Sequence, residues 1–356
     1  MAFQPLNGLV RGLHHITLVT SNQEVNRRFY TEVLGLRRVK LSVNQDDIFH
    51  RHLFYADEKG TTGSAITFFE WPELPPGTAG LGSPHHLAYR VPRLDALPAW
   101  VSWLRAAGLH VTGPLLRDAR VSIYLRDPDG VRIEIAAPND EKLTQADVTE
   151  LGLRDPAVTA ITENMRLATF DHASPITSDP ALTVRFFQKF VGLDSAFSIP
   201  DPDQGDAAIL AIGSPERPDF LRYLAYRWAR EGRVGRGSVH HIAMAVEDDE
   251  DQLKIMRHLD DVGIGNSGIV DRLWFHSLYF RDPDGNLLEV ATKGPGYTAD
   301  ESPGALGSRL VLPDWIEPRR MEIEAFLRKT DAADAVGWPP VYPPTPGKPE
   351  ALTQAG

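Results

Sequence analysis

Three doubled histidines and two glutamates at a repeated spacing are the residues of this chain best suited to chemistry. Glu134 follows His86 by 48 residues, and Glu289 follows His241 by the same 48. Glu289 lies in the apolar run 286–292, where a carboxylate is costly to bury unless it is paired or bound to a metal. Imidazole and carboxylate groups both bind divalent transition metals. The recurring spacing therefore favours a metal site over the simpler interpretation of these histidines as hydrogen-bonded core residues.

A third ligand is expected from the first strand of another repeat, where His15 and His172 occupy equivalent places. Two histidines and one carboxylate on one face, with other coordination positions open, form the ligand set of non-haem Fe(II) oxygenases. The 48-residue spacing alone does not show which repeat supplies the third ligand. Pairing of neighbouring repeats would give the ligand sets His15, His86, Glu134 and His172, His241, Glu289. Pairing of the outer repeats with each other would give the sets His15, His241, Glu289 and His86, His172, Glu134.

The elements that must position these residues form an internal repeat. Residues 85–136 match residues 240–291, 155 positions later, without a gap, and both segments contain His-His, Arg-Asp-Pro-Asp-Gly and a terminal Glu. A fainter match at an offset of 157 relates the segment around His15 to that around His172. Self-similarity at fixed spacing marks repeated structural units. The chain therefore contains four modules, at about 10–72, 84–138, 166–213 and 238–293.

Each module is predicted to be a strand, a helix and three further strands. Short β-branched runs such as His240–Val246 indicate strands. Apolar residues at helical spacing predict four helices, at 26–34, 94–107, 181–191 and 251–262, each followed by a glycine suited to a left-handed helix end. A βαβββ unit leaves one sheet face bare, so modules must pair and enclose a cavity. The predicted fold class is α+β, with four βαβββ modules paired into two curved, open β-barrels.

Three parts of the chain follow from this organisation. Residues 1–150 hold the N-terminal pair of modules, residues 151–300 the C-terminal pair, and residues 301–356 a C-terminal extension with a Pro-rich tail from Gly337. A Pro-rich tail of this kind is typical of extended chain.

The combination of His-His-Ile, Phe-Tyr-x-x-x-Leu-Gly-Leu and Arg-Asp-Pro-Asp-Gly-x-x-x-Glu resembles the vicinal-oxygen-chelate (glyoxalase, bleomycin resistance and dioxygenase) superfamily over residues 10–295. Further segments resemble its branch of ring-cleaving hydroquinone dioxygenases: Gly12–Thr17, Gly60–Phe69, Arg272–Arg281, Glu289–Thr292 and Leu312–Arg320. This resemblance implies a vicinal-oxygen-chelate fold and favours pairing of the first module with the fourth.

The same resemblance implies the site residues. It gives His15, His241 and Glu289 as metal ligands and assigns His14, His240, Arg272 and Tyr279 to catalytic positions beside the metal. Regular strand alternation would turn His14 and His240 to the opposite face, unless a bulge intervenes. The second module departs from the branch because it keeps His86, Glu134 and the accompanying Arg and Tyr. That half-site is either a relic or a second metal site, with one functional metal favoured.

The implied activity is extradiol-type ring cleavage of hydroquinone-like or catechol-like aromatics by a non-haem Fe(II) dioxygenase in aromatic compound catabolism. Fe(II) is the expected cofactor, with Mn(II) or another divalent metal as alternatives, and the partners are a small aromatic substrate and O₂. One rival is a glyoxalase-like lyase or isomerase using His15, Glu70, His241 and Glu289. The other is a non-catalytic module that binds a small molecule.

Composition excludes several classes of function. The chain has 37 Lys and Arg against 48 Asp and Glu, a net charge of −11, which disfavours nucleic acid and anionic membranes as partners. Zero Cys excludes disulfides, thiolate metal sites and Cys nucleophiles. The N-terminus lacks the apolar run of a signal peptide, and no run approaches the roughly 18 apolar residues of a membrane helix. A cytoplasmic protein is expected, and homo-oligomerisation is left open.

Overall fold

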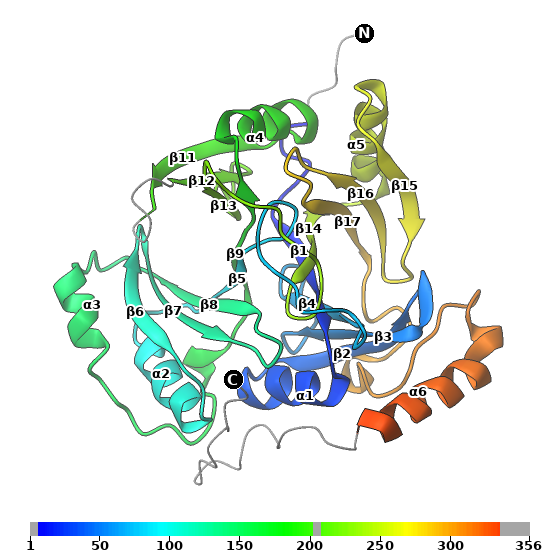
Figure 1. The fold of residues 1–356 in the computed structure, drawn as a ribbon, viewed down its shortest axis with the longest axis horizontal. Coiled ribbons are helices and arrows are strands. Elements are labelled where there is room, and N and C mark those ends of the chain that lie inside the picture. The colour runs from blue at the N-terminus through cyan, green and yellow to red at the C-terminus, as the bar shows by residue number, and fades with distance from the viewer. Residues whose placement is uncertain (1–5, 202–207, 335–356) are drawn as a thin grey trace.

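Two curved mixed sheets with helices on their outer faces make up the fold (Figure 1). The structure is a computed structural model that describes residues 6–201 and 208–334, so the Pro-rich tail lies outside the described residues. The four predicted βαβββ modules are confirmed. The first consists of β1 (Leu13–Thr20), α1 (Gln23–Arg28), η1 (Phe29–Val33), β2 (Arg37–Asn44), β3 (Asp47–Ala56) and β4 (Ala65–Glu70). The second consists of β5 (His86–Arg90), α2 (Ala96–Ala106), β6 (Thr112–Arg117), β7 (Arg120–Arg126) and β8 (Arg132–Pro138).

The other two modules repeat this order after a linker. The linker contains α3 (Gln145–Leu151) and η2 (Glu163–Met165). The third module consists of β9 (Thr169–Ser174), β10 (Ile176–Thr177), α4 (Pro180–Phe186), η3 (Phe187–Val191), β11 (Asp194–Pro200), β12 (Ala208–Gly213) and β13 (Leu221–Ala225). The fourth consists of β14 (Val239–Val246), α5 (Asp249–Asp261), β15 (Asn266–Asp271), β16 (Phe275–Arg281) and β17 (Leu287–Pro295). The extension adds η4 (Pro303–Ala305), η5 (Glu317–Arg319) and α6 (Arg320–Asp334).

The first module pairs with the fourth, and the second pairs with the third. One sheet has the order β15-β16-β17-β14-β1-β4-β3-β2, and the other runs β11-β12-β13-β9-β5-β8-β7-β6. The antiparallel pairs β1–β14 and β5–β9 join the modules at the centre of each sheet. Each sheet therefore combines modules from both halves of the chain. The expected domain boundary near residue 150 remains a prediction about the chain, and the two sheets cut across it.

The repeated Asp-Pro-Asp-Gly turns tie one sheet to the other. Tyr30 of the first module donates to Asp127 of the second at 3.1 Å, and Tyr223 of the third donates to Asp282 of the fourth at 2.7 Å. These aspartates also accept from backbone amides inside their own turns. Burial raises the pKa of Asp127 to about 8 and that of Asp282 to about 6. The turns thus link the two sheets through buried hydrogen bonds.

Helix ends follow the predicted glycine positions. Gly35, Gly108, Gly192 and Gly263 have φ between +71° and +80°, the left-handed region that glycine adopts without steric cost. Gly192 caps η3 directly and lies against the backbone of Leu6. Among the described residues, no helix combines the length and apolar character needed to cross a bilayer.

The extension after residue 300 packs on the outer edge of the first sheet. Ile316, Ile323 and Leu327 form an apolar cluster with Val43 of β2. Beside them, the fully buried Lys40 places its Nζ 2.6 Å from both Asp300 Oδ1 and Glu301 Oε2. Asp300 also accepts from Trp274 Nε1 at 2.9 Å, so this ion cluster connects the extension to the fourth module.

Replacing Lys40 tests whether this buried cluster holds the extension in place. We expect Lys40→Met to lower the free energy of unfolding by about 3–5 kcal/mol, because Glu301 would remain buried without its counter-charge. The measurement is chemical denaturation followed by circular dichroism. Lys254→Met is the matched control, since Lys254 also contacts two carboxylates but on the exposed face of α5, and it should leave stability close to that of the wild type. Equal effects of the two substitutions would contradict this role.

Candidate metal centre

Glu289 is the centre of a cluster of metal-ligand atoms in the first sheet. It is the third residue of β17, between Ala243 of β14 and Tyr279 of β16, and its side chain is fully buried. Its Oε2 atom is 2.9 Å from His241 Nε2 and 3.3 Å from His15 Nε2. The two imidazole nitrogens are themselves 3.4 Å apart. The structure therefore brings together the three residues expected as ligands, from both ends of the chain.

The donor atoms fit a divalent metal. The three ligand atoms lie within 4.8 Å of one another, and Glu289 Oε2 accepts no hydrogen bond of acceptable geometry despite complete burial. Glu289 Oε1 is held separately by Ser277 Oγ at 2.6 Å, which leaves Oε2 directed at the histidines. Burial alone would raise the pKa of Glu289, but His15 and His241 hold it well below its usual value. The carboxylate is thus ionised and ready to bind a cation.

Local irregularities in the β1–β14 ladder bring both members of each doubled histidine near this cluster. The register shifts between Leu13 and His15 on one strand, and past His240 on the other. An extra residue in a strand pair breaks the alternation of side chains. The His14 Nδ1 atom consequently lies 2.8 Å from His15 Nδ1, and the same distance separates His240 Nδ1 from His241 Nδ1. These two bulges explain why His14 and His240 do not turn to the opposite face of the sheet.

His14 and His240 each contact the ring of the histidine that follows them in the sequence. For His15 Nε2 to face a cation with its lone pair, His15 Nδ1 must carry the proton and donate to His14 Nδ1. Burial, followed by the charge of His15, lowers the pKa of His14 to about 3, so its ring is neutral and able to accept. Burial and His241 lower the pKa of His240 in the same way, also to about 3. His14 and His240 are therefore placed to accept a hydrogen bond from the neighbouring ring, and their catalytic roles remain a prediction.

Arg272 and Tyr279 lie together at one side of the cluster. The Arg272 guanidinium is 5.5 Å from the centre of the Tyr279 ring, and Tyr279 lies edge-on to His241 at 5.6 Å. Burial and the charge of Glu289 raise the pKa of Tyr279, while Arg272 opposes that shift. Arg272 also binds Asp46 at 2.8 Å, at the tip of the β2–β3 hairpin. The phenol therefore keeps its proton while facing the metal ligands.

Sequence reasoning missed His52, which lines the same cavity. His52 Nε2 lies 2.9 Å from Thr67 Oγ1, and its ring packs on Phe54 and Phe69 at 4.0 and 4.5 Å. Burial, followed by the charges of His15 and His241, lowers its pKa well below the usual value. The position of His52 directly before the apolar run Leu53–Ala56 of β3 was the available signal. The cavity is about 30 Å³ in volume, and its walls are mainly aromatic.

Glu70 lies outside the cluster, contrary to the four-ligand interpretation. In the β1–β4 pair the position equivalent to Glu289 is Thr67, three residues before Glu70. The Glu70 carboxylate instead binds Arg51 at 2.7 Å and the backbone amide of Gln23 at 2.8 Å. The prediction that Glu70 occupies the position equivalent to Glu289 is therefore wrong, since that position lies three residues earlier.

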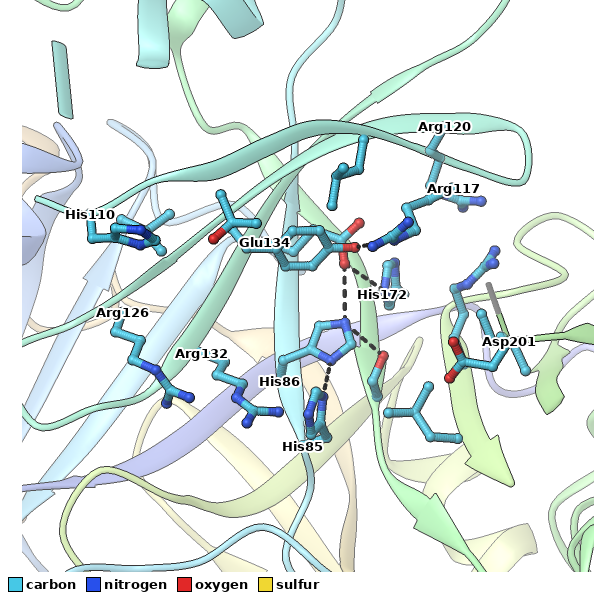
Figure 2. Close-up of a pocket in the computed structure, with 18 of the residues that line it drawn as sticks. His85, His86, His110, Arg117, Arg120, Arg126, Arg132, Glu134, His172 and Asp201 are labelled. Carbon is cyan, nitrogen blue, oxygen red and sulfur yellow. Dashed lines mark hydrogen bonds and ion pairs between the residues drawn. The ribbon is translucent and has the colours of Figure 1, made fainter. Parts of the chain in front are cut away.

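The duplicated residues of the second and third modules form a second cluster. His86, His172 and Glu134 place their ligand atoms within 4.8 Å of one another (Figure 2). Pairing of outer modules, one of the two arrangements that the spacing left open, is the one found in the structure.

Comparison with known proteins agrees with this architecture. The family model described as the glyoxalase/bleomycin resistance protein/dioxygenase superfamily matches residues 12–135 and 169–290, most of all four modules. The chain belongs to this superfamily. The recognition and the fold class expected from the sequence are confirmed.

Several proteins with similar sequences have names of ring-cleaving dioxygenases. The putative ring-cleaving dioxygenase MhqA of Bacillus subtilis (strain 168) is 34% identical, covering 90% of this chain and 98% of its own length. The chlorohydroquinone/hydroquinone 1,2-dioxygenase of Sphingobium indicum is 26% identical over 88% and 95% of the two chains. A solved putative dioxygenase from Bacillus subtilis superposes with a TM-score of 0.74 at 29% identity, over 89% and 96%. Glyoxalase I from Zea mays, at 16% identity and a TM-score of 0.57 over 79% and 92%, shares the fold. The chain is a ring-cleaving dioxygenase of this superfamily.

The assignment of Glu289 as a ligand is tested by comparing it with Glu70. We expect Glu289→Gln to lose one equivalent of bound metal per chain, because a neutral amide cannot replace the ionised carboxylate between two histidines. Metal content is measured after anaerobic purification, with folding checked by circular dichroism. Glu70→Gln, a buried glutamate at the end of β4, should retain the wild-type metal content. Loss of metal in both variants, or in neither, would contradict the assignment.

Proposed function

We propose that His15, His241 and Glu289 bind Fe(II) and that the enzyme cleaves the ring of para-hydroquinones with O₂. The observation that supports this most is the bare, ionised Oε2 atom of Glu289 between two imidazole nitrogens. Relatives named as ring-cleaving dioxygenases, one of them with hydroquinone in its name, supply the substrate class. Mn(II) would satisfy the same donor set and is the alternative metal.

The donor set explains which chemistry the metal would add. Held by these three side chains, Fe(II) would have coordination positions open to a substrate oxygen and O₂ and would supply the means of electron transfer between them. Overall, one ring carbon–carbon bond breaks beside a hydroxyl, and both atoms of O₂ enter the ring-opened product. No external reductant is required, since the ring supplies the electrons.

The protein groups around the cluster manage protons and position the ring. Tyr279 is protonated and 5.6 Å, ring to ring, from His241, so it can donate a hydrogen bond or a proton to an oxygen on that side. Arg272 stacks on Tyr279 and supplies positive charge for a phenolate. The neutral His52 lines the cavity from β3 and can accept a hydrogen bond from a substrate hydroxyl. Phe69 and Phe275 offer apolar surface to the ring.

Access to the site requires the β2–β3 hairpin to move. The cavity of about 30 Å³ is well below the roughly 300 Å³ at which small-molecule sites begin. Gln45 and Asp46 at the hairpin tip bind the backbone and the side chain of Arg272, respectively. Asp46 is 72% exposed, so its ion pair with Arg272 is weak and can open to admit substrate.

The rival functions fit less well. A glyoxalase-like site with a fourth ligand loses its support because Glu70 is occupied by Arg51. A non-catalytic binding module would have no need for a buried carboxylate directed at two histidines, which is costly without a cation.

Tyr279→Phe tests the proposed proton donor. We expect turnover of hydroquinone to fall by about 10²-fold or more, because general acid catalysis typically contributes that much. Metal content should stay unchanged, since the Tyr279 hydroxyl is not one of the ligand atoms. The assay follows O₂ uptake and the absorbance of the ring-opened product across a panel of hydroquinones and catechols.

The matched control is Tyr89→Phe, which removes the hydroxyl of another fully buried tyrosine that lies in the core of the other sheet. Its turnover should stay near that of the wild type. Wild-type activity in Tyr279→Phe would remove Tyr279 from the mechanism. Activity on catechols alone would change the substrate class, and absence of O₂ uptake with every compound would end the dioxygenase proposal.

A further inference from the structure

The second sheet contains a complete second set of metal-ligand atoms. His86 Nε2 lies 3.1 Å from Glu134 Oε2, and His172 Nε2 lies 3.6 Å from the same oxygen. Ser122 Oγ donates to Glu134 Oε1 at 2.6 Å, the same distance at which Ser277 holds Glu289. The arrangement of the first cluster is therefore repeated, including the hydroxyl on Oε1, and here Glu134 Oε2 and Ser174 Oγ each lie 3.1 Å from His86 Nε2.

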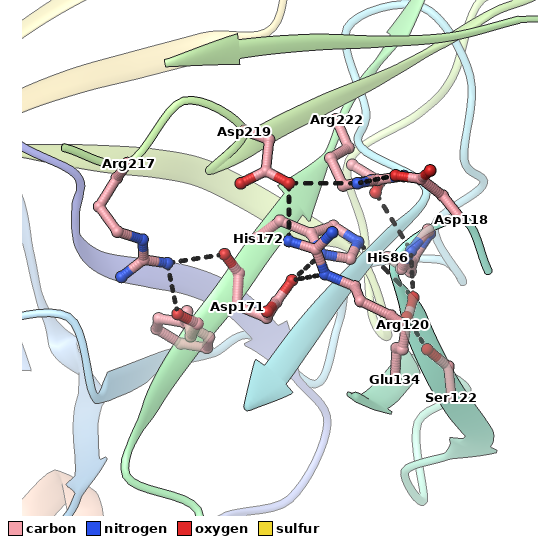
Figure 3. Close-up of polar contacts among 12 residues, drawn as sticks. His86, Asp118, Arg120, Ser122, Glu134, Asp171, His172, Arg217, Asp219 and Arg222 are labelled. Carbon is pink, nitrogen blue, oxygen red and sulfur yellow. Dashed lines mark hydrogen bonds and ion pairs between the residues drawn. The ribbon is translucent and has the colours of Figure 1, made fainter. Parts of the chain in front are cut away.

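Groups behind these ligands hold them in a metal-binding orientation. Asp171 Oδ1 accepts from His172 Nδ1 at 2.8 Å, which leaves His172 Nε2 with its lone pair facing Glu134. A carboxylate behind a ligand histidine is a recurrent support in metal sites. Arg120 in turn binds Asp171 and Asp219 (Figure 3). Asp171 occupies the repeat position of His14, and Arg120 occupies the repeat position of Phe275. The residues that support the ligands of the second cluster therefore differ from those of the first.

The cavity in front of this cluster has the size of a ligand site. Its volume is about 630 Å³, against about 30 Å³ at the first cluster, and it falls in the range of small-molecule sites. Leu115, Leu125 and Ile209 line it together with Tyr124 and Tyr226. These walls suit the apolar body of an aromatic ring.

The cavity also carries two arginines that form no ion pair within residues 6–201 and 208–334. Arg120 and Arg222 pair with aspartates, but Arg126 and Arg132 form no ion pair with a carboxylate of the described residues. Burial, followed by the neighbouring charge of Arg126, lowers the pKa of Arg132, as expected for two adjacent guanidinium groups. Figure 2 shows both arginines on the same side of His85 and His86. In the first sheet the position of Arg132 is taken by Leu287, so the charge of Arg132 has no counterpart in the first site.

We propose that His86, His172 and Glu134 bind a second divalent metal ion and that the adjoining cavity binds an aromatic hydroxy acid. The ring hydroxyl faces the metal, the ring contacts the leucines and tyrosines, and the carboxylate pairs with Arg126 and Arg132. This site is independent of hydroquinone cleavage at the first cluster.

Metal counting tests the second site. Apo-protein is titrated with Mn(II), and free Mn(II) is followed by electron paramagnetic resonance. We expect two equivalents in the wild type, one in Glu134→Gln, one in Glu289→Gln and none in the double variant. His172→Ala repeats the second-site test should Glu134→Gln fail to fold, which circular dichroism reports.

The outcomes separate the two sites. One equivalent in the wild type, lost in Glu289→Gln and unaffected by Glu134→Gln and His172→Ala, overturns the second metal site. One equivalent lost only in Glu134→Gln supports the second site and removes the metal from the first.

Ligand binding tests the acid preference. In the Glu289→Gln background, loaded with Mn(II), we expect 3,4-dihydroxybenzoate to bind about tenfold more tightly than catechol by calorimetry, since one charge-assisted contact contributes about that much. Removing Mn(II) should weaken both. Arg132→Leu, which installs the residue of the first site, should abolish the preference, whereas Arg93→Leu, an exposed arginine in the β5–α2 connection, should keep it. Equal binding of the two compounds, or a preference unchanged in Arg132→Leu, overturns the proposed anion site.

Discussion

The architecture of the first sheet depends on how the fully buried carboxylate of Glu289 is stabilised. Removing a charge from water costs several kcal/mol unless a counter-charge and hydrogen bonds replace the lost hydration. Ser277 supplies one hydrogen bond to Oε1, and His15 and His241 place their Nε2 atoms 3.3 and 2.9 Å from Oε2. Those histidines come from two strands that must lie side by side, so satisfying one side chain requires the first and fourth modules to share a sheet. The strand bulges, the doubled histidines and the antiparallel β1–β14 contact all follow from that requirement.

Because the modules are duplicated, the same arrangement of strands surrounds two residue clusters with different neighbours. Both clusters keep a Glu, two His and a Ser at matching positions, because these residues solve the same burial problem twice. The surroundings have changed. Phe275 packs against His14 and His15 in one site, and Arg120 with Asp171 takes that place in the other. The first site is narrow, aromatic and covered by a hairpin tip, while the second is wide and cationic. The residues proposed to bind metal are thus distinct from those that shape the two cavities.

The sequence predicted the modules because their signals are local. Helical spacing, a glycine after each helix and the Asp-Pro-Asp-Gly turn each act within about ten residues. Pairing stayed open because the 48-residue spacing of His241 and Glu289 lies inside one module and carries no information about its partner. The bulges at His14 and His240 depend on the facing strand, so alternation along one strand could not reveal them. Glu70 was misplaced for a related reason, since only the β1–β4 register shows that Thr67 holds the equivalent position. The ligand roles and the identity of the metal remain predictions.

The order of the modules has a consequence for how the chain is made. His86 and His172 belong to adjacent modules, whereas His15 and His241 are separated by 226 residues. At about 5–20 residues per second, roughly 10–45 s pass on the ribosome between synthesis of the two histidines of the first cluster. The second and third modules can form their sheet during that interval, while β1 waits with one edge unpaired. An open strand edge is a template for association with other chains. The newly made N-terminal module is therefore the part of this enzyme that most needs protection until translation ends.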